Sequence, residues 1–520
     1  MKYPIGTQTF STLIEDNLVY VDKTDLVYEL SQKRVCFLCR PRRFGKSLLI
    51  STLESYFKGE KHLFEGLKIA SLEKDWKPFP VFHIDFSLGN YEKPDGLLEV
   101  LENYLGKWEK QYGIENHASQ SGIRFGNVIS AVRQQNGQKA VVLIDEYDKP
   151  MLDVLMTPQE ETNRNILKEF YSVFKYSDPD LRFVFLTGVT KFSQVSVFSG
   201  FNQAKDISMD SRFDALCGIT EQELHDYFDE ELDQLASKYG CPKETLCEMF
   251  KKRYDGYHFS EQMLDVYNPF SVLNALDSMR LDDFWFSSGT PTYLVKLLHR
   301  SQTDMQKILG RTYAKKYFVD YKADKEEPLP MLYQSGYVTI KGFDMRRNEF
   351  MLDYPNNEVR NGFVDILAND YLNLHGETNT LAMDVSEMLG SCRLDDLRDS
   401  LTSFFASIPY TANQNERATS FESHFQYTFY LVFRLLSCYV TLMEKQNSHG
   451  RADMIVETDK YIYVFEFKLD GSAQEALEQI DAQGYAEPYA NDSRKLFKVG
   501  VNFSSAKRTI VDWKNVGPLE

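Results

Sequence analysis

The chain has 520 residues, more than a single hydrophobic core usually holds, so we expect several domains. Its 43% apolar and 26% charged residues are ordinary for a folded globular protein and argue against bulk disorder. The formal net charge of −17 argues against a protein that coats nucleic acid through a general positive field. A local basic groove, a nucleotide or a partner protein remains compatible with this charge.

The cysteine content and the hydropathy pattern point to a cytoplasmic protein. Seven cysteines, an odd number scattered along a long chain, are typical of reduced thiols and not of a disulfide framework. The N-terminus lacks the charged start and apolar run of a signal peptide. The longest apolar stretch, residues 427–443, is interrupted by Arg434 and is shorter than the about 20 apolar residues of a spanning helix. We therefore expect no membrane partner.

Strand-like and helical patterns alternate in the first part of the chain. The segment 140–145 is apolar throughout, as central strands of parallel sheets are. Segments alternating in this way predict a parallel sheet covered by helices on both faces. The expected strands are 34–39, 80–86, 140–145 and 182–187, and the expected helices are 47–57, 95–112 and 160–176.

The rest of the chain falls into three further parts. A capping-box sequence at Thr220–Glu223 opens a helical stretch, so we expect a helical lid over 219–300. Residues 301–384 mix short helices with strand-like pieces and predict a small connecting module, for which a winged-helix form is one candidate. From 385 to 520 a helix–strand–strand–helix–strand order predicts a separate α/β domain.

The segment Arg40-Pro-Arg-Arg-Phe-Gly-Lys-Ser47 joins the first strand to the first helix and has the features of a phosphate-binding loop. In such a loop, backbone N–H groups wrap phosphates at a helix N-terminus, where the helix dipole favours anions. Lys46 would reach the β- and γ-phosphates, and the Ser47 hydroxyl would bind Mg²⁺. Arg40 replaces the usual first Gly of the motif, so this segment alone leaves a coincidental match open.

The strand 141–145 supplies the expected partner of this loop, because it ends in Asp145 and is followed by Glu146. Asp145 would hold Mg²⁺ through its water shell, as in hydrolytic P-loop enzymes. Glu146 would polarise the attacking water as a general base. Two acids could instead simply end a buried strand at the surface, but the Gly-Lys-Ser sequence upstream favours the catalytic interpretation.

Further residues are candidates for contact with ATP. Thr187 ends the fourth expected strand and is placed to sense the γ-phosphate. Arg42 and Arg43 could stabilise phosphate charge or be solvated loop cations, and Arg212 is a weaker candidate for an arginine finger. The complete expected ATP-binding set is Arg42, Arg43, Phe44, Gly45, Lys46, Ser47, Leu48, Asp145 and Thr187.

These motifs together resemble the AAA-ATPase-like family found in many bacterial and mobile-element-associated proteins. The resemblance rests on Val21-Asp-Lys-Thr24, the loop 40–47 and Leu143-Ile-Asp-Glu-Tyr-Asp-Lys-Pro150, with 254–259 and 266–269 similar to its lid. A missing first Gly is normal for that family. The resemblance implies a P-loop NTPase sheet of the additional-strand type, ATP and Mg²⁺ as cofactors, and a homo-oligomer as an open expectation.

A second constellation lies near the C-terminus. Asp453 lies on one expected strand, and Glu466 and Lys468 lie on the next, where strand alternation places both on the same face. Two carboxylates can hold one or two Mg²⁺ ions against a scissile phosphate, while the lysine steadies the attacking water or the developing charge. The alternative is a surface strand that carries a common Glu–Lys pair.

Three supporting residues strengthen the nuclease interpretation. Glu422, at the start of an expected helix 421–437, could supply a further metal ligand, and Gln479 and Tyr485 have the spacing of a Gln-x5-Tyr pattern. Over roughly 400–515 the arrangement resembles the RecB-like branch of the PD-(D/E)XK nuclease superfamily. The resemblance implies a restriction-endonuclease-like fold with Asp453, Glu466 and Lys468 as catalytic residues and with Asp453, Glu466 and Glu422 as metal ligands.

The sequence therefore predicts an α/β protein with four parts: an ATPase core (1–218), a helical lid (219–300), a connecting module (301–384) and a nuclease-like domain (385–520). We expect ATP hydrolysis coupled to Mg²⁺-dependent action on nucleic acid, with DNA favoured over RNA. Acidic residues outnumber basic ones in the last part, which weakens the case for tight DNA binding. The alternative is an ATP-driven switch or scaffold, mobile-element or defence-related, whose C-terminal domain binds without cleaving.

Overall fold

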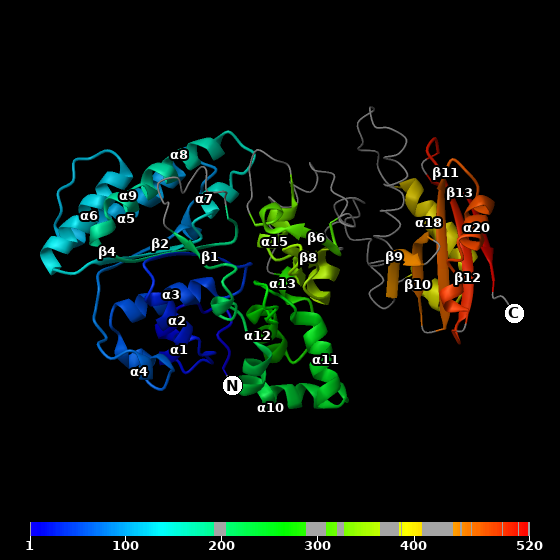
Figure 1. The fold of residues 1–520 in the computed structure, drawn as a ribbon, viewed down its shortest axis with the longest axis horizontal. Helices are drawn as coiled ribbons and strands as arrows, with labels where there is room; N and C mark the ends of the chain where they lie inside the picture. Colours follow the sequence, from blue (N-terminus) through cyan, green and yellow to red (C-terminus); the bar gives the residue numbers. More distant parts are fainter. Residues whose placement is uncertain are drawn as a thin grey trace. The chain divides into compact units, whose positions relative to one another are not determined.

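The structure is a computed structural model (Figure 1). The chain forms two compact units, Met1–Arg360 and Asn361–Glu520, each held together mainly by contacts within itself. It describes residues 2–191, 204–287, 308–319, 327–363, 384–385, 387–407, 440–447, 450–458, 460–490, 492–507 and 509–517.

A five-stranded parallel sheet forms the centre of the first unit, as the alternation of strands and helices predicts. The strands have the order β2-β3-β4-β1-β5, and every neighbouring pair is parallel. Because β4 lies between β1 and β3, the sheet has the inserted strand of the additional-strand type. The strands are β1 (Val35–Cys39), β2 (Val81–Asp85), β3 (Ala140–Asp145), β4 (Leu181–Gly188) and β5 (Lys205–Asp206), of which β5 is not apparent in the sequence pattern.

Helices cover both faces of this sheet (Figure 1). On one face Phe57 of α3 packs 5.0 Å from Phe183 of β4, and on the other Phe125 of α6 packs 5.6 Å from Phe82 of β2, measured between ring centroids. The first face carries α1 (Phe10–Glu15), α2 (Thr24–Ser31), α3 (Lys46–Phe57) and α4 (Ile69–Leu72), and the second carries α5 (Gly96–Tyr112), α6 (Ser121–Asn136), α8 (Gln159–Tyr171) and α9 (Val173–Tyr176). The expected helix 160–176 is thus two helices, α8 and α9.

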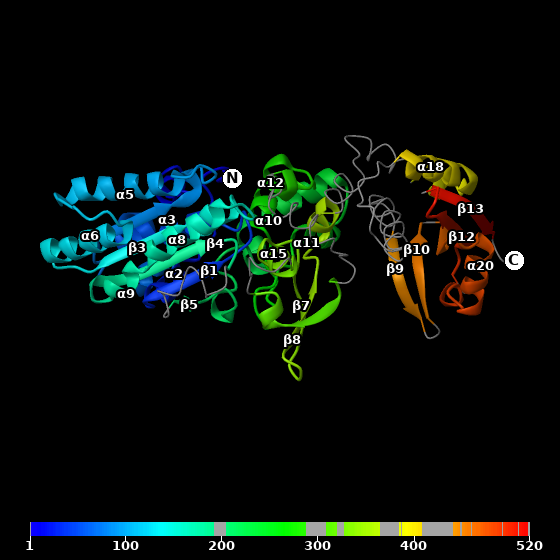
Figure 2. The ribbon, with the colours of Figure 1, turned by 90° about the horizontal axis from the view of Figure 1, so that it is seen from above.

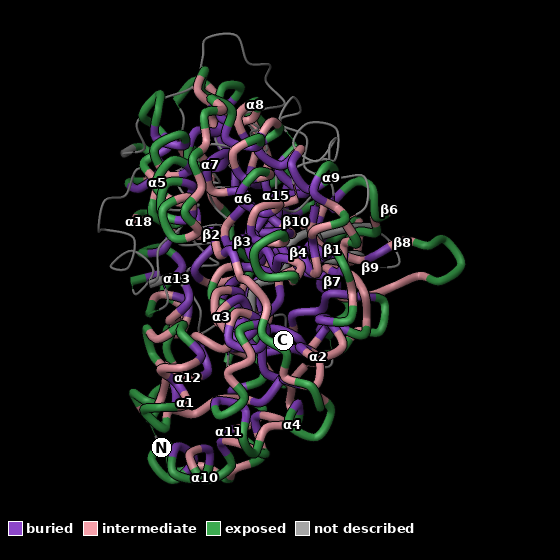
Figure 3. The backbone as a smooth tube through the Cα atoms, turned by 90° about the vertical axis from the view of Figure 1, so that its left-hand side faces the viewer, coloured by how far each residue is buried: buried purple, intermediate pink, exposed green. Residues whose placement is uncertain are grey.

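The central strands β1, β3 and β4 of the first unit are almost entirely buried (Figure 3). All residues of β3 are buried, which explains its continuous apolar sequence. In α5, apolar residues that recur every three or four positions (Leu97, Leu101, Leu105 and Trp108) face the sheet and are at most 5% exposed. Among the residues that the structure describes, no helix is long and apolar enough to cross a membrane.

A helical subdomain follows the core, and its first helix begins at the predicted capping box. The Thr220 side chain accepts a hydrogen bond from the Glu223 N–H at 3.3 Å, and the Glu223 carboxylate accepts one from the Thr220 N–H at 2.9 Å. The N-terminal residues Tyr3, Val19 and Val21 pack against the apolar core of this subdomain. Its helices are α10 (Glu221–Tyr239), α11 (Lys243–Tyr254), α12 (Pro269–Ser278) and α13 (Phe284–Ser287).

A small antiparallel sheet completes the first unit (Figure 2). Its order is β6-β8-β7, and the short helix α15 (Leu329–Gln334) precedes β7. The His258 N–H donates to Thr339 Oγ1 at 3.0 Å, and His258 Nδ1 lies 2.7 Å from the Ile340 carbonyl oxygen. These bonds join the sheet to the segment after α11. The strands are β6 (Arg311–Ala314), β7 (Thr339–Asp344) and β8 (Glu349–Asp353).

The second unit is a mixed sheet between two helices, in agreement with the expected α/β domain. The order is β13-β12-β11-β10-β9, and only the pair β11–β12 is parallel within this sheet. The helix α18 (Leu394–Ser407) packs on one face, and α20 (Ala473–Ala482) packs on the other. The strands are β9 (Val440–Asn447), β10 (Gly450–Glu457), β11 (Tyr461–Leu469), β12 (Lys495–Ser504) and β13 (Thr509–Val516).

Candidate ATP and nuclease sites

The loop between β1 and α3 turns sharply before the helix begins. Gly45 has φ 86° and Arg43 has φ 66°, both in the left-handed region. A Cβ on Gly45 would meet no atom within 4 Å, so the conformation rather than lack of space favours glycine there. The loop leads directly into the 12-residue helix α3, whose first N–H groups have no helical acceptor and can bind an anion.

Lys46 lies inside the loop, with only 7% of its surface exposed. Its ammonium donates to the carbonyl oxygens of Arg40 at 3.0 Å and Pro41 at 2.9 Å. Burial raises the pKa values of Glu146 and Asp148 after β3, and the Lys46 ammonium opposes this increase. The loop and the segment after β3 meet at the end of β4, where the Arg40 N–H donates to the Gly188 carbonyl at 3.3 Å and the Tyr147 N–H donates to the Thr187 carbonyl at 3.0 Å.

Asp145 and Thr187 form a hydrogen-bonded pair at the ends of neighbouring strands. Asp145 is 3% exposed, and its Oδ1 accepts from Thr187 Oγ1 at 2.6 Å and from the Glu146 N–H at 3.0 Å. These two donors fix the orientation of the Asp145 carboxylate. Thr187, which the sequence suggests as a γ-phosphate sensor, thus contacts the expected magnesium ligand directly.

Glu146 adopts a strained backbone conformation at the candidate site. Its φ of 50° is left-handed, which costs a non-glycine residue about 1 kcal/mol or more. Burial raises the pKa of its carboxyl group, and the charges of Asp145 and Asp148 add to this increase against the ammonium of Lys46. A raised pKa brings a carboxylate closer to the basicity that a general base needs.

Asp148 is a buried acid of this region for which the sequence suggests no role. It is 1% exposed, and its Oδ2 accepts from the Val189 N–H at 3.0 Å, the Thr190 N–H at 2.6 Å and Thr190 Oγ1 at 2.8 Å. It thereby fixes the turn that follows β4. The signal available in the sequence is its place in the Asp-Glu-Tyr-Asp string after β3.

The arginines near the loop have different surroundings. Arg40 is 1% exposed, donates to the carbonyls of Ser208 at 2.8 Å and Phe213 at 3.0 Å, and stacks 3.9 Å from the Phe259 ring centroid. Its structural role explains why an arginine stands at the first motif position. Arg43 is exposed, with its guanidinium 5.0 Å from the Phe270 ring, and Arg212 pairs with Asp210 on the surface.

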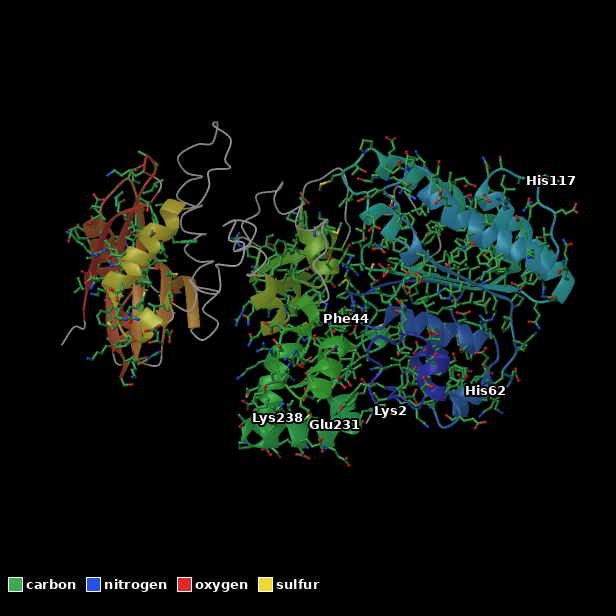
Figure 4. All side chains as sticks on the ribbon, turned by 180° about the vertical axis from the view of Figure 1, so that it is seen from behind. Lys2, Phe44, His62, His117, Glu231 and Lys238 are labelled. Carbon is green, nitrogen blue, oxygen red and sulfur yellow. The ribbon has the colours of Figure 1, made fainter. Side chains whose placement is uncertain are left out.

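Phe44 faces the helical subdomain (Figure 4). Its ring is 1% exposed and lies edge-on to Tyr257 and Phe259, with centroid distances of 4.8 and 5.6 Å. The side chain therefore anchors the loop, which leaves its backbone for a phosphate contact. Ser47 and Leu48 are half-buried in the first turn of α3.

In the second unit, Asp453 and Glu466 lie side by side on adjacent antiparallel strands. Met454 of β10 pairs with Phe465 of β11, so these two acids are the next residues along the ladder. The Asp453 N–H donates to Glu466 Oε2 at 3.4 Å, and Asp453 Oδ2 accepts from the Phe467 N–H at 2.9 Å. Glu466 is 1% exposed. The two successive strands that the sequence predicts for these acids are thus neighbours in the sheet.

Lys468 shares a sheet face with these two acids. Ile462 and Val464, at alternate positions of β11, belong to the apolar cluster beneath α20, so Glu466 and Lys468 point to the same side. The Lys468 ammonium donates to Gln479 Oε1 of α20. The predicted supporting residue Gln479 is therefore in contact with the predicted catalytic lysine.

The helix α20 lies close to the sheet at this point. A Cβ on Gly500, the β12 neighbour of Glu466, would stand 2.2 Å from the Ala473 carbonyl oxygen. This glycine lets α20 approach, which brings Gln479 to the strand. Tyr485, the other supporting residue, is 5% exposed in the apolar cluster after α20.

The donor set of this site suits a hard cation, since carboxylate oxygens are the ligands that Mg²⁺ prefers. Within the parts of the chain that the structure describes, no group of three His, Cys, Asp or Glu residues converges as metal ligands would. The expected third acid, Glu422, and its helix 421–437 lie outside these parts. Asp453 and Glu466 would thus supply two carboxylate ligands, and water and a phosphate oxygen could complete the coordination of the metal.

Comparison with known proteins identifies a family for each of the two regions that carry these candidate sites. Residues 4–198 match the AAA-ATPase-like family, described as predicted AAA-ATPases, and residues 420–513 match the PD-(D/E)XK nuclease superfamily. The chain is 35% identical over 520 residues, 98% of each chain, to an uncharacterized protein in the vnfD 5′ region of Azotobacter chroococcum mcd 1. The chain therefore belongs to the AAA-ATPase-like family and carries a C-terminal domain of the PD-(D/E)XK nuclease superfamily.

Proposed function

We propose that the first unit binds and hydrolyses ATP and that this reaction controls cleavage of nucleic acid, DNA in preference to RNA, by the second unit. The observation that carries the ATPase part is the junction of the phosphate loop and the segment after β3 at the end of β4, where the Arg40 N–H donates to the Gly188 carbonyl at 3.3 Å and the Tyr147 N–H donates to the Thr187 carbonyl at 3.0 Å. The observation that carries the nuclease part is the shared face of Asp453, Glu466 and Lys468. Free thiols at the cysteines that the structure describes support a cytoplasmic location.

In the proposed ATP reaction, the loop amides and Lys46 hold the triphosphate. Arg42 and Arg43 are available to stabilise its negative charge. Ser47 and Asp145 would hold Mg²⁺, which neutralises phosphate charge when bound. Glu146 accepts the proton of the attacking water. Thr187 keeps the Asp145 carboxylate oriented through their 2.6 Å hydrogen bond.

In the proposed nuclease reaction, Asp453 and Glu466 would hold Mg²⁺, with Glu422 as a further ligand, and the metal would polarise the phosphate and lower the pKa of water. Lys468 stabilises the negative charge that develops on the scissile phosphate. Gln479 orients the lysine by accepting from its ammonium. Such a positioning hydrogen bond keeps the charge fixed before the reaction begins.

A cleavage assay on the full chain tests the nuclease part. The protein is incubated with single- and double-stranded DNA and RNA, with Mg²⁺ or Mn²⁺, and with or without ATP. We expect DNA cleavage that Asp453→Ala and Lys468→Ala abolish. Lys498→Ala is the matched control, because Lys498 lies on the same face of the sheet and pairs with Asp481 of α20. Equal cleavage by all variants would contradict the assignment.

A second candidate function is an ATP-driven switch or scaffold, mobile-element or defence-related, whose C-terminal domain binds nucleic acid or protein without cutting it. The excess of acidic over basic residues in 385–520 favours this alternative, because a negatively charged domain binds the phosphate backbone of a nucleic acid less tightly. Absence of cleavage under all conditions, combined with ATP-dependent growth of the particle mass in light scattering, would support this function and a homo-oligomer.

A further inference from the structure

Trp285 contacts the phosphate loop from the side of the helical subdomain. It lies in α13, is 5% exposed, and its indole Nε1 donates to the carbonyl oxygen of Arg42 at 3.2 Å. Its ring packs edge-on to Tyr337, with centroids 5.1 Å apart. An indole N–H is a donor only, and a buried one needs an acceptor. Here the acceptor belongs to the loop that we assign to the triphosphate.

The Trp285 backbone is held in turn by Glu358. This carboxylate is 1% exposed, and its Oε1 accepts from the Trp285 N–H at 2.7 Å. Its Oε2 accepts from Ser271 Oγ of α12 at 2.7 Å. Glu358 stands just before Arg360, the last residue of the first unit. Trp285 thus connects the phosphate loop, through its indole, with Glu358 near the end of this unit, through its backbone N–H.

The segment around Glu358, residues 354–360, is seated on the helical subdomain by further contacts. Asn356 Nδ2 donates to the Asp255 carbonyl at 2.9 Å, and Asn356 Oδ1 accepts from the Val359 N–H at 3.0 Å. A Cβ on Gly256 would lie 2.4 Å from the Pro355 carbonyl oxygen. We call 354–360 the exit segment, because the chain passes from it into the second unit.

We propose that Trp285 is a positioning residue that fixes the Arg42 carbonyl of the phosphate loop and transmits the nucleotide state of the loop to Glu358 and the exit segment. The inference rests on the proposed ATP binding. A donor–acceptor distance of 3.2 Å is at the long end for an N–H···O bond, so a small shift of the loop carbonyl strengthens or breaks it. The buried Glu358 then receives that shift through the Trp285 backbone.

Hydrogen exchange of the exit segment, measured in the full chain with and without MgATP, tests the inference. Trp285→Phe keeps an aromatic ring against Tyr337 but removes the Nε1 donor. We expect MgATP to change the exchange of 354–360 in the wild type. In Trp285→Phe that change should fall strongly, while the affinity for MgATP shifts by about fivefold at most, the effect of one neutral hydrogen bond.

Trp108→Phe is the matched control, since Trp108 is equally buried at 5% but packs on α6 and β2. It should leave the MgATP-induced change intact. Ser271→Ala, which removes one donor to Glu358, provides a second variant if Trp285→Phe does not fold, and it should reduce the change in the same direction.

The outcomes separate the inference from the proposed function. If the wild type binds no MgATP, the ATPase assignment fails and the inference fails with it. If the wild type binds MgATP but the exit segment does not respond, or responds equally in Trp285→Phe, the relay through Trp285 is wrong while the ATP site stands.

Discussion

The two candidate sites are assembled in different ways. In the first unit, the phosphate loop and the acids after β3 come together because a parallel sheet brings the carboxyl ends of its strands to one edge, with β4 between them. In the second unit, Asp453 and Glu466 meet because they face each other across neighbouring antiparallel strands. A site made by sheet topology depends on the whole fold, whereas a site made by a strand pair depends mainly on local register.

The two lysines show the same contrast. Lys46 is held by carbonyl oxygens of its own loop, and Lys468 is held by the side chain of Gln479 on a packed helix. A bond to the backbone of the loop responds when the loop changes shape. A bond to a helix side chain keeps a fixed position. The candidate ATP site is therefore suited to change with its ligand, and the candidate nuclease site is suited to remain preorganised.

The largest expected effect concerns the lysine of the phosphate loop. Lys46→Ala removes the ammonium that neutralises the γ-phosphate, so kcat/KM for ATP hydrolysis should fall by about 10³-fold. Lys33→Ala is the control, because Lys33 has partners of its own outside the loop, Glu29 at 4.0 Å and the Phe213 ring centroid at 5.1 Å. A loss below tenfold in Lys46→Ala would show that the loop does not hold the triphosphate as proposed. Unchanged DNA cleavage and affinity in this variant would refute the coupling between the units.

Glu146→Gln should separate binding from hydrolysis. The amide keeps the shape of the side chain but cannot accept the proton of water, so kcat should fall by about 10²- to 10⁴-fold while MgATP still binds. Because burial raises the pKa of Glu146, wild-type turnover should decline on acidification at a higher pH than that of a solvated glutamate. A pH profile of kcat, combined with direct binding, checks both points. Wild-type kcat in the variant would exclude Glu146 as the base.

Gln479→Ala should have a smaller effect in the second unit. The variant leaves Lys468 without its partner on α20 but keeps the charge, so cleavage should fall by about tenfold with little change in KM, provided that cleavage is present in the wild type. Gln474→Ala, on the exposed part of the same helix, is the control. If Gln479→Ala matches Lys468→Ala in its loss of cleavage, the distinction between orienting and reacting residues is wrong.

The smallest expected effect concerns Asp255, beside the exit segment. Burial raises its pKa from 3.8 to about 7, Asp265 and Glu221 add to the increase, and Lys251 at 3.6 Å opposes it. The folded state therefore binds a proton that the unfolded state releases, and the free energy of unfolding falls as pH rises from about 4 to 7.

Asp255→Asn removes this titration. Its stability relative to the wild type should therefore be greater at pH 8 than at pH 5, by on the order of 2 to 3 kcal/mol, because about two units of the pKa shift lie between these pH values. Denaturant unfolding at pH 5 and pH 8 measures the difference. A stability gap between the variant and the wild type that does not change with pH would contradict the raised pKa.

The sequence predicts much of this architecture because its signals are local. Four of the parallel strands follow from apolar runs, and the helix that begins after Thr220 follows from its capping box. The shared face of Glu466 and Lys468 follows from strand alternation. These features need no knowledge of contacts that are distant in the chain.

Other features depend on distant partners and leave no local pattern. The short strand β5 pairs with β1 across a long stretch of sequence, so only the assembled sheet reveals it. The buried position of Arg40 depends on Ser208 and Phe213, and the bond from Trp285 depends on the Arg42 carbonyl. Asp148 resembles any acid after a strand until its contacts with the turn at Thr190 are known.

The measurement that tests the central claim most directly is calorimetric titration of the full chain with MgATP. We predict saturable binding at one site per chain, weakened at least about tenfold in Lys46→Ala, because that variant loses the buried ammonium of the phosphate loop. The absence of binding heat up to millimolar MgATP, or equal affinity in the wild type and Lys46→Ala, would contradict the claim.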